Sequence, residues 1–182
     1  ASREAGELGG AGAGRGGADD EAVSILAHPA EYRRKNCRAA YGSATGTCLG
    51  PPEAGVDLNR NYAGFWGGRG AGTDPLAPDY RGPGPFSEPE TLAVRALFSA
   101  NSVTAFVSNH TYANLILRPP GLTTQGRPVD ERILRPLGAR MAARNGYASI
   151  PGWGLYETTG TTEDWAYYAT GSLGFTFEIG AN

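Results

Sequence analysis

The stretch GVDLNRNYAGFWGG, residues 55–68, places an asparagine and an arginine side by side at Asn59 and Arg60. The planar guanidinium of arginine donates two parallel hydrogen bonds to a carboxylate, and the amide of asparagine supplies another donor. The pair therefore suits the binding of a carboxylate. The same residues would also suit a turn, because asparagine side chains hydrogen-bond to nearby backbone groups. From these residues alone, a turn and a carboxylate clamp both remain open.

Two further residues that could do chemistry lie at the ends of predicted strands. His110 follows VTAFVSN, which has the β-branched and aromatic composition of a buried strand, and open α/β sheets bind ligands at the carboxyl ends of strands. Glu178 lies in the apolar segment GFTFEIG, where partial burial would raise its pKa toward that of a useful general base. The alternatives are a structural histidine and a glutamate at an edge that faces water.

Helices and strands alternate around these residues. SEPETLAVRALFSAN predicts a helix with a capping box formed by Ser87 and Glu90. VDERILRPLGARMAARNG predicts a second helix, which Pro136 is expected to kink or divide. Extended segments are expected at VTAFVSN, NLILRPPG and LGFTFEIG. The succession of helix and strand predicts the α/β class.

The composition limits the possible partners. A chain of 182 residues, 40% of them hydrophobic and without an apolar run long enough to cross a bilayer, predicts one domain with a real core and no membrane partner. The formal net charge of −2 and the scattered arginines argue against binding of nucleic acid. Cys37 and Cys48 lack metal-site spacing and predict a local disulfide, which favours an exported protein.

The first residues differ in composition from the rest of the chain. Residues 1–20 are rich in glycine and contain no aromatic or β-branched residue, so they cannot bury enough surface to offset the entropy of ordering. We therefore expect residues 1–30 to form a disordered, glycine-rich arm or linker and residues 31–182 to form the folded part.

Six segments occur in a fixed order along the chain, and together they resemble a known family. They are RRKNCR, GVDLNRNY, FWGGRGAGTDPLAPDYRGPGPFSEPET, NHTYANLILRPPG, LYETTGTTEDWAYY and GFTFEIG, and they extend over residues 33–180. In order and style they resemble the zinc metallocarboxypeptidases of the carboxypeptidase A/B type, in particular their secreted bacterial members. The resemblance implies the zinc exopeptidase fold, a mixed and mostly parallel sheet flanked by helices, as a partial catalytic domain incomplete at both ends.

The resemblance also implies an activity and its catalytic residues. It implies a secreted, Zn²⁺-dependent enzyme that removes C-terminal amino acids from peptides or proteins, and we expect a monomer. His110 resembles a zinc ligand, Glu178 the general base that takes a proton from the zinc-bound water, and Arg34 the arginine that polarises the scissile carbonyl. An activated water, a proton shuttle and a fixed positive charge are what amide hydrolysis needs.

Residues for substrate binding follow from the same resemblance. Asn59 and Arg60 match the pair that binds the terminal carboxylate of the substrate, Tyr156 matches a mobile tyrosine that closes over it, and Tyr112 resembles a residue of the neighbouring subsite. Glu163 falls at the base of the family's side-chain pocket, where an acid would pair with a C-terminal lysine or arginine of the substrate. We therefore expect a basic or mixed side-chain preference.

The alignment in this loop could slip by one position onto Asp164, which the family pattern makes structural instead. A second departure concerns the metal. The family takes its first two zinc ligands from a His-x-x-Glu motif well before the arginine that Arg34 matches, and the sequence has no room for it. HPAE, His28 to Glu31, has the same spacing, but its internal proline and its place beside the glycine-rich arm favour a coincidence over a ligand pair. The alternatives are therefore a catalytically inactive fragment or module that binds C-terminal carboxylates, or a relative that trims cell-wall peptides.

Overall fold

The computed structural model describes residues 34–36 and 55–180. Four sequence predictions lie outside these ranges: the glycine-rich arm at residues 1–30, the disulfide between Cys37 and Cys48, and the possible metal ligands His28 and Glu31. No helix in the described ranges is long and apolar enough to cross a membrane.

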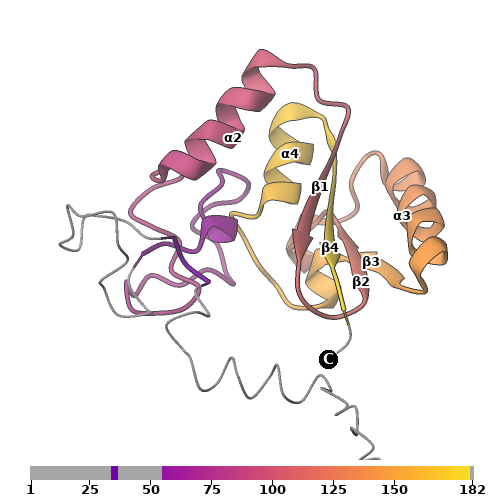
Figure 1. The fold of residues 1–182 in the computed structure, drawn as a ribbon, viewed down its shortest axis with the longest axis horizontal. Coiled ribbons are helices and arrows are strands. Elements are labelled where there is room, and N and C mark those ends of the chain that lie inside the picture. The colour runs from indigo at the N-terminus through magenta and orange to yellow at the C-terminus, as the bar shows by residue number, and fades with distance from the viewer. Residues whose placement is uncertain (1–33, 37–54, 181–182) are drawn as a thin grey trace, which may run out of the picture. The chain divides into compact units, whose positions relative to one another are not determined.

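A four-stranded sheet forms the centre of the described structure (Figure 1). Its strands are β1 (Ala105–His110), β2 (Leu115–Arg118), β3 (Ala148–Pro151) and β4 (Leu173–Glu178), in the spatial order β1-β4-β2-β3. β1 pairs with β4 and β2 with β3 in parallel, whereas β2 and β4 are antiparallel. The predicted mixed, mostly parallel sheet is confirmed.

Two helices pack on this sheet, α3 (Glu131–Asn145) and α4 (Thr162–Thr170), and α2 (Pro89–Ala100) packs against α4 and reaches β1 through Phe98 and Phe106. Thr176 of β4 hydrogen-bonds to a side chain of α4, whereas Phe175 meets α3 at Gly138. Successive side chains of a strand point to opposite faces, so α3 and α4 cover opposite faces of the sheet, as Figure 1 shows.

Two apolar clusters hold the layers together. One joins α2 to α4 through Tyr62, Phe86, Phe98, Trp165 and Ala166. The other joins the sheet to α3 and to the end of α4 through Ile116, Leu134, Ala142, Tyr167 and Phe175. Because α4 contributes to both clusters, the start of α4 is fixed relative to the ends of β1 and β4.

The predicted capping box of the first helix is wrong. α2 begins at Pro89, and Glu88 occupies the N-cap position without a side-chain capping bond. Proline favours the first helical position because its missing N–H would have no partner there, which moves the start past Ser87. The hydroxyl of Ser87 instead donates to the carboxylate of Glu88 and accepts from Asn61.

Two other expectations also need correction. α3 continues through Pro136 as one helix from Glu131 to Asn145, so the proline does not divide it. β1, predicted as a buried strand, lies at an edge of the sheet in the described structure, and Val107 is 44% exposed. Its β-branched and aromatic residues alternate between exposed and half-buried because one face only is covered.

Asn61 organises the loops between the first turn and α2. Its buried amide nitrogen donates to the carbonyls of Arg81 and Gly84 and to the hydroxyl of Ser87. Its amide oxygen accepts from the backbone N–H of Glu88 and the hydroxyl of Thr91. One side chain thus satisfies polar groups along residues 81–91, from the loop to the first turn of α2.

We predict that Asn61→Ala destabilises the protein by about 2–4 kcal/mol, because several buried polar groups lose their partners. Urea unfolding measures the free energy of unfolding. Asn101→Ala is the matched control, since this exposed asparagine makes a single bond to the Leu97 carbonyl. Equal losses for the two variants would contradict the role given to Asn61.

Candidate active site

The parallel pairing of β1 with β4 brings His110 and Glu178 together. In this register His110 is the partner of Glu178, and both are the last residues of their strands. The Nε2 atom of His110 lies 2.9 Å from the hydroxyl of Ser108. The imidazole and the carboxylate predicted from separate strand ends therefore lie at one edge of the sheet.

The carboxyl group of Glu178 lies in a mixed electrostatic environment. Glu178 is 7% exposed, and burial is the main cause of the upward shift of its pKa. His110 lowers the pKa, Glu163 raises it, and the guanidinium groups of Arg34 and Arg60 lower it. The net shift is upward, which suits a group that accepts a proton and later returns it.

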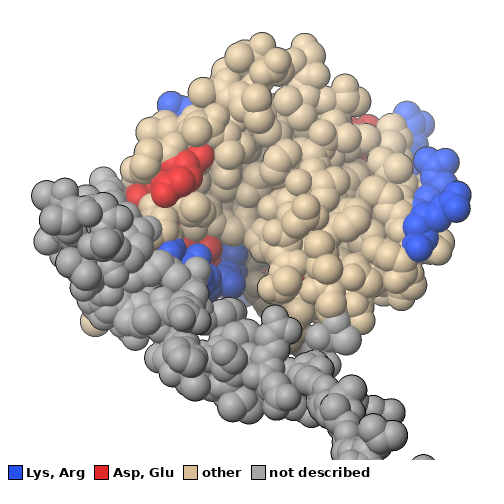
Figure 2. Space-filling model, in the orientation of Figure 1, with Lys and Arg blue, Asp and Glu red and all other residues tan. Residues whose placement is uncertain are grey.

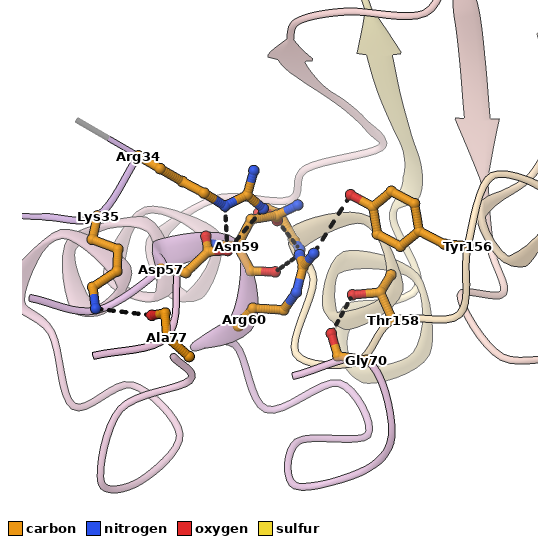
Figure 3. A network of polar contacts seen from close by, with 10 residues as sticks. Arg34, Lys35, Asp57, Asn59, Arg60, Gly70, Ala77, Tyr156 and Thr158 are labelled. Carbon is orange, nitrogen blue, oxygen red and sulfur yellow. Dashed lines mark hydrogen bonds and ion pairs between the residues drawn. The ribbon is translucent and has the colours of Figure 1, made fainter. Parts of the chain in front are cut away.

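A 3-10 turn, Leu58–Arg60, carries the recognition residues. Asp57 precedes it and accepts the backbone N–H of Asn59 at 3.1 Å. The same carboxylate accepts from Nε and Nη2 of Arg34, each at 2.8 Å (Figure 3). Burial alone lowers the pKa of Arg34, but Asp57 and Tyr156 outweigh it and raise the pKa above its usual value. Arg34 thus stays charged beside the site.

The guanidinium of Arg60 is buried without a carboxylate that pairs with it in the described residues. Arg60 is 3% exposed. Nη1 donates to the carbonyl of Asn59 at 2.9 Å, and Nη2 lies 3.5 Å from the hydroxyl of Tyr156 (Figure 3). Nε has no hydrogen-bond partner among the described residues. A buried cation with a free donor is costly unless an anion binds there.

Asn59 is oriented by the start of α4. Its amide oxygen accepts from the backbone N–H and the hydroxyl of Thr162, at 3.0 and 2.9 Å. Because the oxygen is engaged, the amide nitrogen is the group that can donate to a ligand. Within residues 34–36 and 55–180 it makes no hydrogen bond. Asn59 and Arg60 therefore both present N–H donors.

The loop before α4 lies close against this turn, and Gly160 makes the approach possible. Gly160 has φ of 73°, and a Cβ there would lie 2.2 Å from the carbonyl oxygen of Arg60. Only glycine adopts this backbone conformation without strain and leaves room for the turn. The loop that carries Tyr156 is thereby held over Arg60.

Two cavities adjoin at Asn59. One is narrow, with room for about 10 Å³, and is lined by Arg60, Tyr156, Glu163 and Glu178, together with Leu117 and Thr176 of the sheet. The other, of about 270 Å³, is lined by Arg34, Asp57, Asn59 and His110. The first contains the carboxylate-binding candidates and the second the remaining catalytic candidates.

The model of one protein family, described as zinc carboxypeptidase, matches residues 28–182. The chain belongs to this family. Mast cell carboxypeptidase A of Rattus norvegicus is 33% identical over 142 residues, which is 73% of this chain and 33% of the relative. Carboxypeptidase A1 of Mus musculus is 34% identical over 133 residues, 69% of this chain and 32% of the relative. The chain thus spans about a third of the length of these relatives.

Solved structures agree with the family. Bovine thrombin-activatable fibrinolysis inhibitor, in complex with tick carboxypeptidase inhibitor, has a TM-score of 0.66 and 29% identity, and the match covers 79% of this chain and 49% of that one. Carboxypeptidase A from Helicoverpa armigera has a TM-score of 0.71 over 88% of this chain and 40% of that one, and its 22% identity supports the fold alone.

Within this zinc carboxypeptidase family member, Glu163 and Asp164 occupy different places. Glu163 is 2% exposed, lines the smaller cavity, and accepts the hydroxyl of Thr176 at 2.9 Å. Asp164 is fully buried and accepts the backbone N–H of Gly121 with both carboxylate oxygens, at 3.2 and 3.0 Å. The geometry thus favours Glu163 over Asp164 as the pocket residue.

Tyr112 lies apart from the other candidates. It follows β1 with its side chain 58% exposed and lines neither of the two cavities. Its assignment to a neighbouring subsite stays a prediction.

Three residues of the site were missed by sequence reasoning. Asp57 could have been found, because an aspartate two residues before Asn59 is a typical start of a turn. Thr162 and Thr176 had no such signal, since their roles depend on contacts with residues far away in the sequence.

The described residues do not fit a zinc ion by themselves. A catalytic zinc takes three protein ligands and a water. His110 is the one histidine in the described ranges, and no group of three His, Cys, Asp or Glu residues there could hold a metal. His28 and Glu31 lie outside these ranges, so the structure does not test whether they replace the missing ligands.

Asp164 should make stability depend on pH. Burial, and next the neighbouring Glu163, raises its pKa from 3.8 to about 8. The folded protein therefore holds a proton that the unfolded chain has already lost between about pH 4 and pH 8. Stability that the protonated group provides at low pH is lost as the pH rises through this window.

We predict that the melting temperature falls from pH 5 to pH 8.5 and that Asp164→Asn makes this fall clearly smaller, because the amide stays neutral. Asp74→Asn, in an exposed loop, is the control and should leave the fall unchanged. An Asp164→Asn protein with the same pH dependence as the wild type would show that Asp164 does not titrate in this way.

Proposed function

We propose that this chain is part of a zinc-dependent metallocarboxypeptidase that recognises the free C-terminal carboxylate of a peptide and prefers a basic C-terminal side chain. The observation that carries the proposal is the buried guanidinium of Arg60, which faces a cavity and has an unpartnered Nε donor. A carboxylate supplies the charge and the acceptor oxygens that this group lacks.

The neighbours of Arg60 support a carboxylate at this point. The amide nitrogen of Asn59 adds a donor whose direction is fixed by the bonds of its oxygen to Thr162. The hydroxyl of Tyr156 lies beside Arg60, and the Arg60 guanidinium is 5.8 Å from the centre of the Tyr156 ring. We propose that these three groups bind one carboxylate, so that the site selects a chain end over an internal peptide bond.

Glu163 supports the preference for a basic side chain. It lines the same cavity as Arg60, and its residue is buried. A buried carboxylate gains from a cation, because the pair offsets the cost of removing each charge from water. The aliphatic part of a lysine or arginine side chain would lie against Leu117 and Leu155.

Glu178 and Arg34 would act on the scissile bond. The raised pKa of Glu178 suits it to take a proton and return it to the leaving amine. Arg34 has a side chain that is 41% exposed, and its fixed positive charge lines the adjoining cavity, where negative charge on the carbonyl oxygen would be stabilised. We assign zinc to the complete protein from its family, and secretion and a monomeric state are proposed with it.

A second candidate is a non-catalytic module that binds C-terminal carboxylates. The described residues include the carboxylate clamp but supply one histidine for metal binding. Metal content and product release distinguish this candidate from the enzyme.

The test of function uses the full chain and N-benzoyl-Gly-Arg as substrate. We expect stoichiometric zinc by elemental analysis, release of free arginine, and loss of release after treatment with a chelator. Glu178→Gln should lower the rate by a factor on the order of 100 or more while substrate binding is retained. Binding without release by the wild-type chain would reject the enzyme and favour the module.

Glu163 should set the side-chain preference. We predict that Glu163→Ile weakens binding of a peptide ending in arginine at least about tenfold relative to one ending in phenylalanine, because a buried charge pair is lost. Calorimetric titration with the two peptides measures the ratio. Glu157→Gln is the matched control, since Glu157 lies on the same loop but contacts Arg69 and Thr123 instead. An unchanged ratio in Glu163→Ile would show that Glu163 is not the pocket residue.

A further inference from the structure

A separate cavity lies on the other face of the sheet from the candidate active site. Leu117 of β2 lines the smaller cavity of the candidate active site, and the next residue, Arg118, lines a cavity of about 470 Å³. Successive side chains on a strand point to opposite faces, so the two cavities lie back to back across β2. Glu131 and Arg135 of α3 form part of its lining.

Arg118 has an unused donor that is buried in this cavity. It is 5% exposed, and its Nε and Nη2 atoms donate to the carboxylate of Glu131 at 3.3 and 2.8 Å. Its Nη1 atom is buried and has no hydrogen-bond partner among the described residues. A buried donor of a charged group without a partner carries a desolvation cost that a bound acceptor would remove.

The side chains that line this cavity have a net positive charge, which a ligand with two negative charges would balance. Arg118, Arg127 and Arg135 contribute three positive charges and Glu131 one negative charge, which leaves +2. Arg127 and Arg135 are exposed, so their side chains can turn toward a ligand. Basic side chains also gather over the region of α3 in Figure 2.

Most of the remaining lining is apolar. Four prolines and the exposed indole of Trp153 line the cavity. Trp153 lies directly after Pro151 and Gly152, and Pro151 is the partner of Arg118 in the pairing of β2 with β3. A planar organic group could therefore stack on the indole while an oxyanion attached to it reaches Arg118.

We propose that this cavity binds a phosphate dianion carried on a small planar organic group. Guanidinium groups donate paired hydrogen bonds to oxyanions of this geometry, and a dianion balances the net charge of the lining. The site is independent of the proposed carboxypeptidase function, because it shares no residue with the two active-site cavities.

The test is calorimetric titration of the full chain at low ionic strength with inorganic phosphate, inorganic sulfate and phenyl phosphate. We expect saturable binding at one site, with phenyl phosphate several-fold tighter than the inorganic ions. The double variant Arg127→Gln/Arg135→Gln should weaken all three at least about tenfold through loss of charge-assisted bonds. Arg144→Gln, on the same helix but outside the cavity lining, should change affinity less than about twofold.

The variants avoid Arg118 itself, because removal of one partner of its pair with Glu131 would destabilise the fold. Absence of saturable binding up to about 10 mM would overturn the site, since the predicted charge complement should give at least millimolar affinity. If the double variant and Arg144→Gln weakened anion binding equally, the binding would be general attraction to a basic surface, which would overturn the site. Phenyl phosphate that binds no tighter than inorganic phosphate would overturn the assignment of an organic group.

Discussion

The buried charge of Arg60 is the constraint on which the arrangement of the candidate active site depends. A guanidinium that is 3% exposed must be held by hydrogen bonds or matched by an anion. The carbonyl of Asn59 and the hydroxyl of Tyr156 meet part of this need, and the approach of the Tyr156 loop is possible because position 160 is glycine. What the protein leaves unpaired is what a substrate carboxylate would supply.

The acids around this charge are separated by their surroundings. Asp164 is fixed by the backbone N–H of Gly121 away from the cavity, whereas Glu163 and Glu178 line it with Arg60. Burial raises the pKa of Asp164 and of Glu178, and the positive groups near Glu178 oppose that shift. The three carboxyl groups thus lie in different surroundings, one held by a backbone N–H and two facing Arg60 in the cavity.

Much of this arrangement followed from the sequence. The strand ends at His110 and Glu178 were predictable because parallel strands in an α/β sheet place their carboxyl ends at one edge, and the mixed sheet followed from the family resemblance. The role of Asn61 was not predictable, because its partners extend over residues 81–91. Local rules failed at Ser87, where Pro89 set the helix start, and at β1, whose exposure depends on which strands flank it.

The central claim is that Arg60 binds the free carboxylate of a peptide chain end. Calorimetric titration of Glu178→Gln protein, which removes the proposed base, with a peptide ending in arginine acid and the same peptide as the amide tests this directly. The account predicts that the acid binds at least about tenfold more tightly and that an added Arg60→Gln removes the difference, whereas an added Arg69→Gln does not. Equal affinity for the acid and the amide, with Arg60 intact, would contradict it.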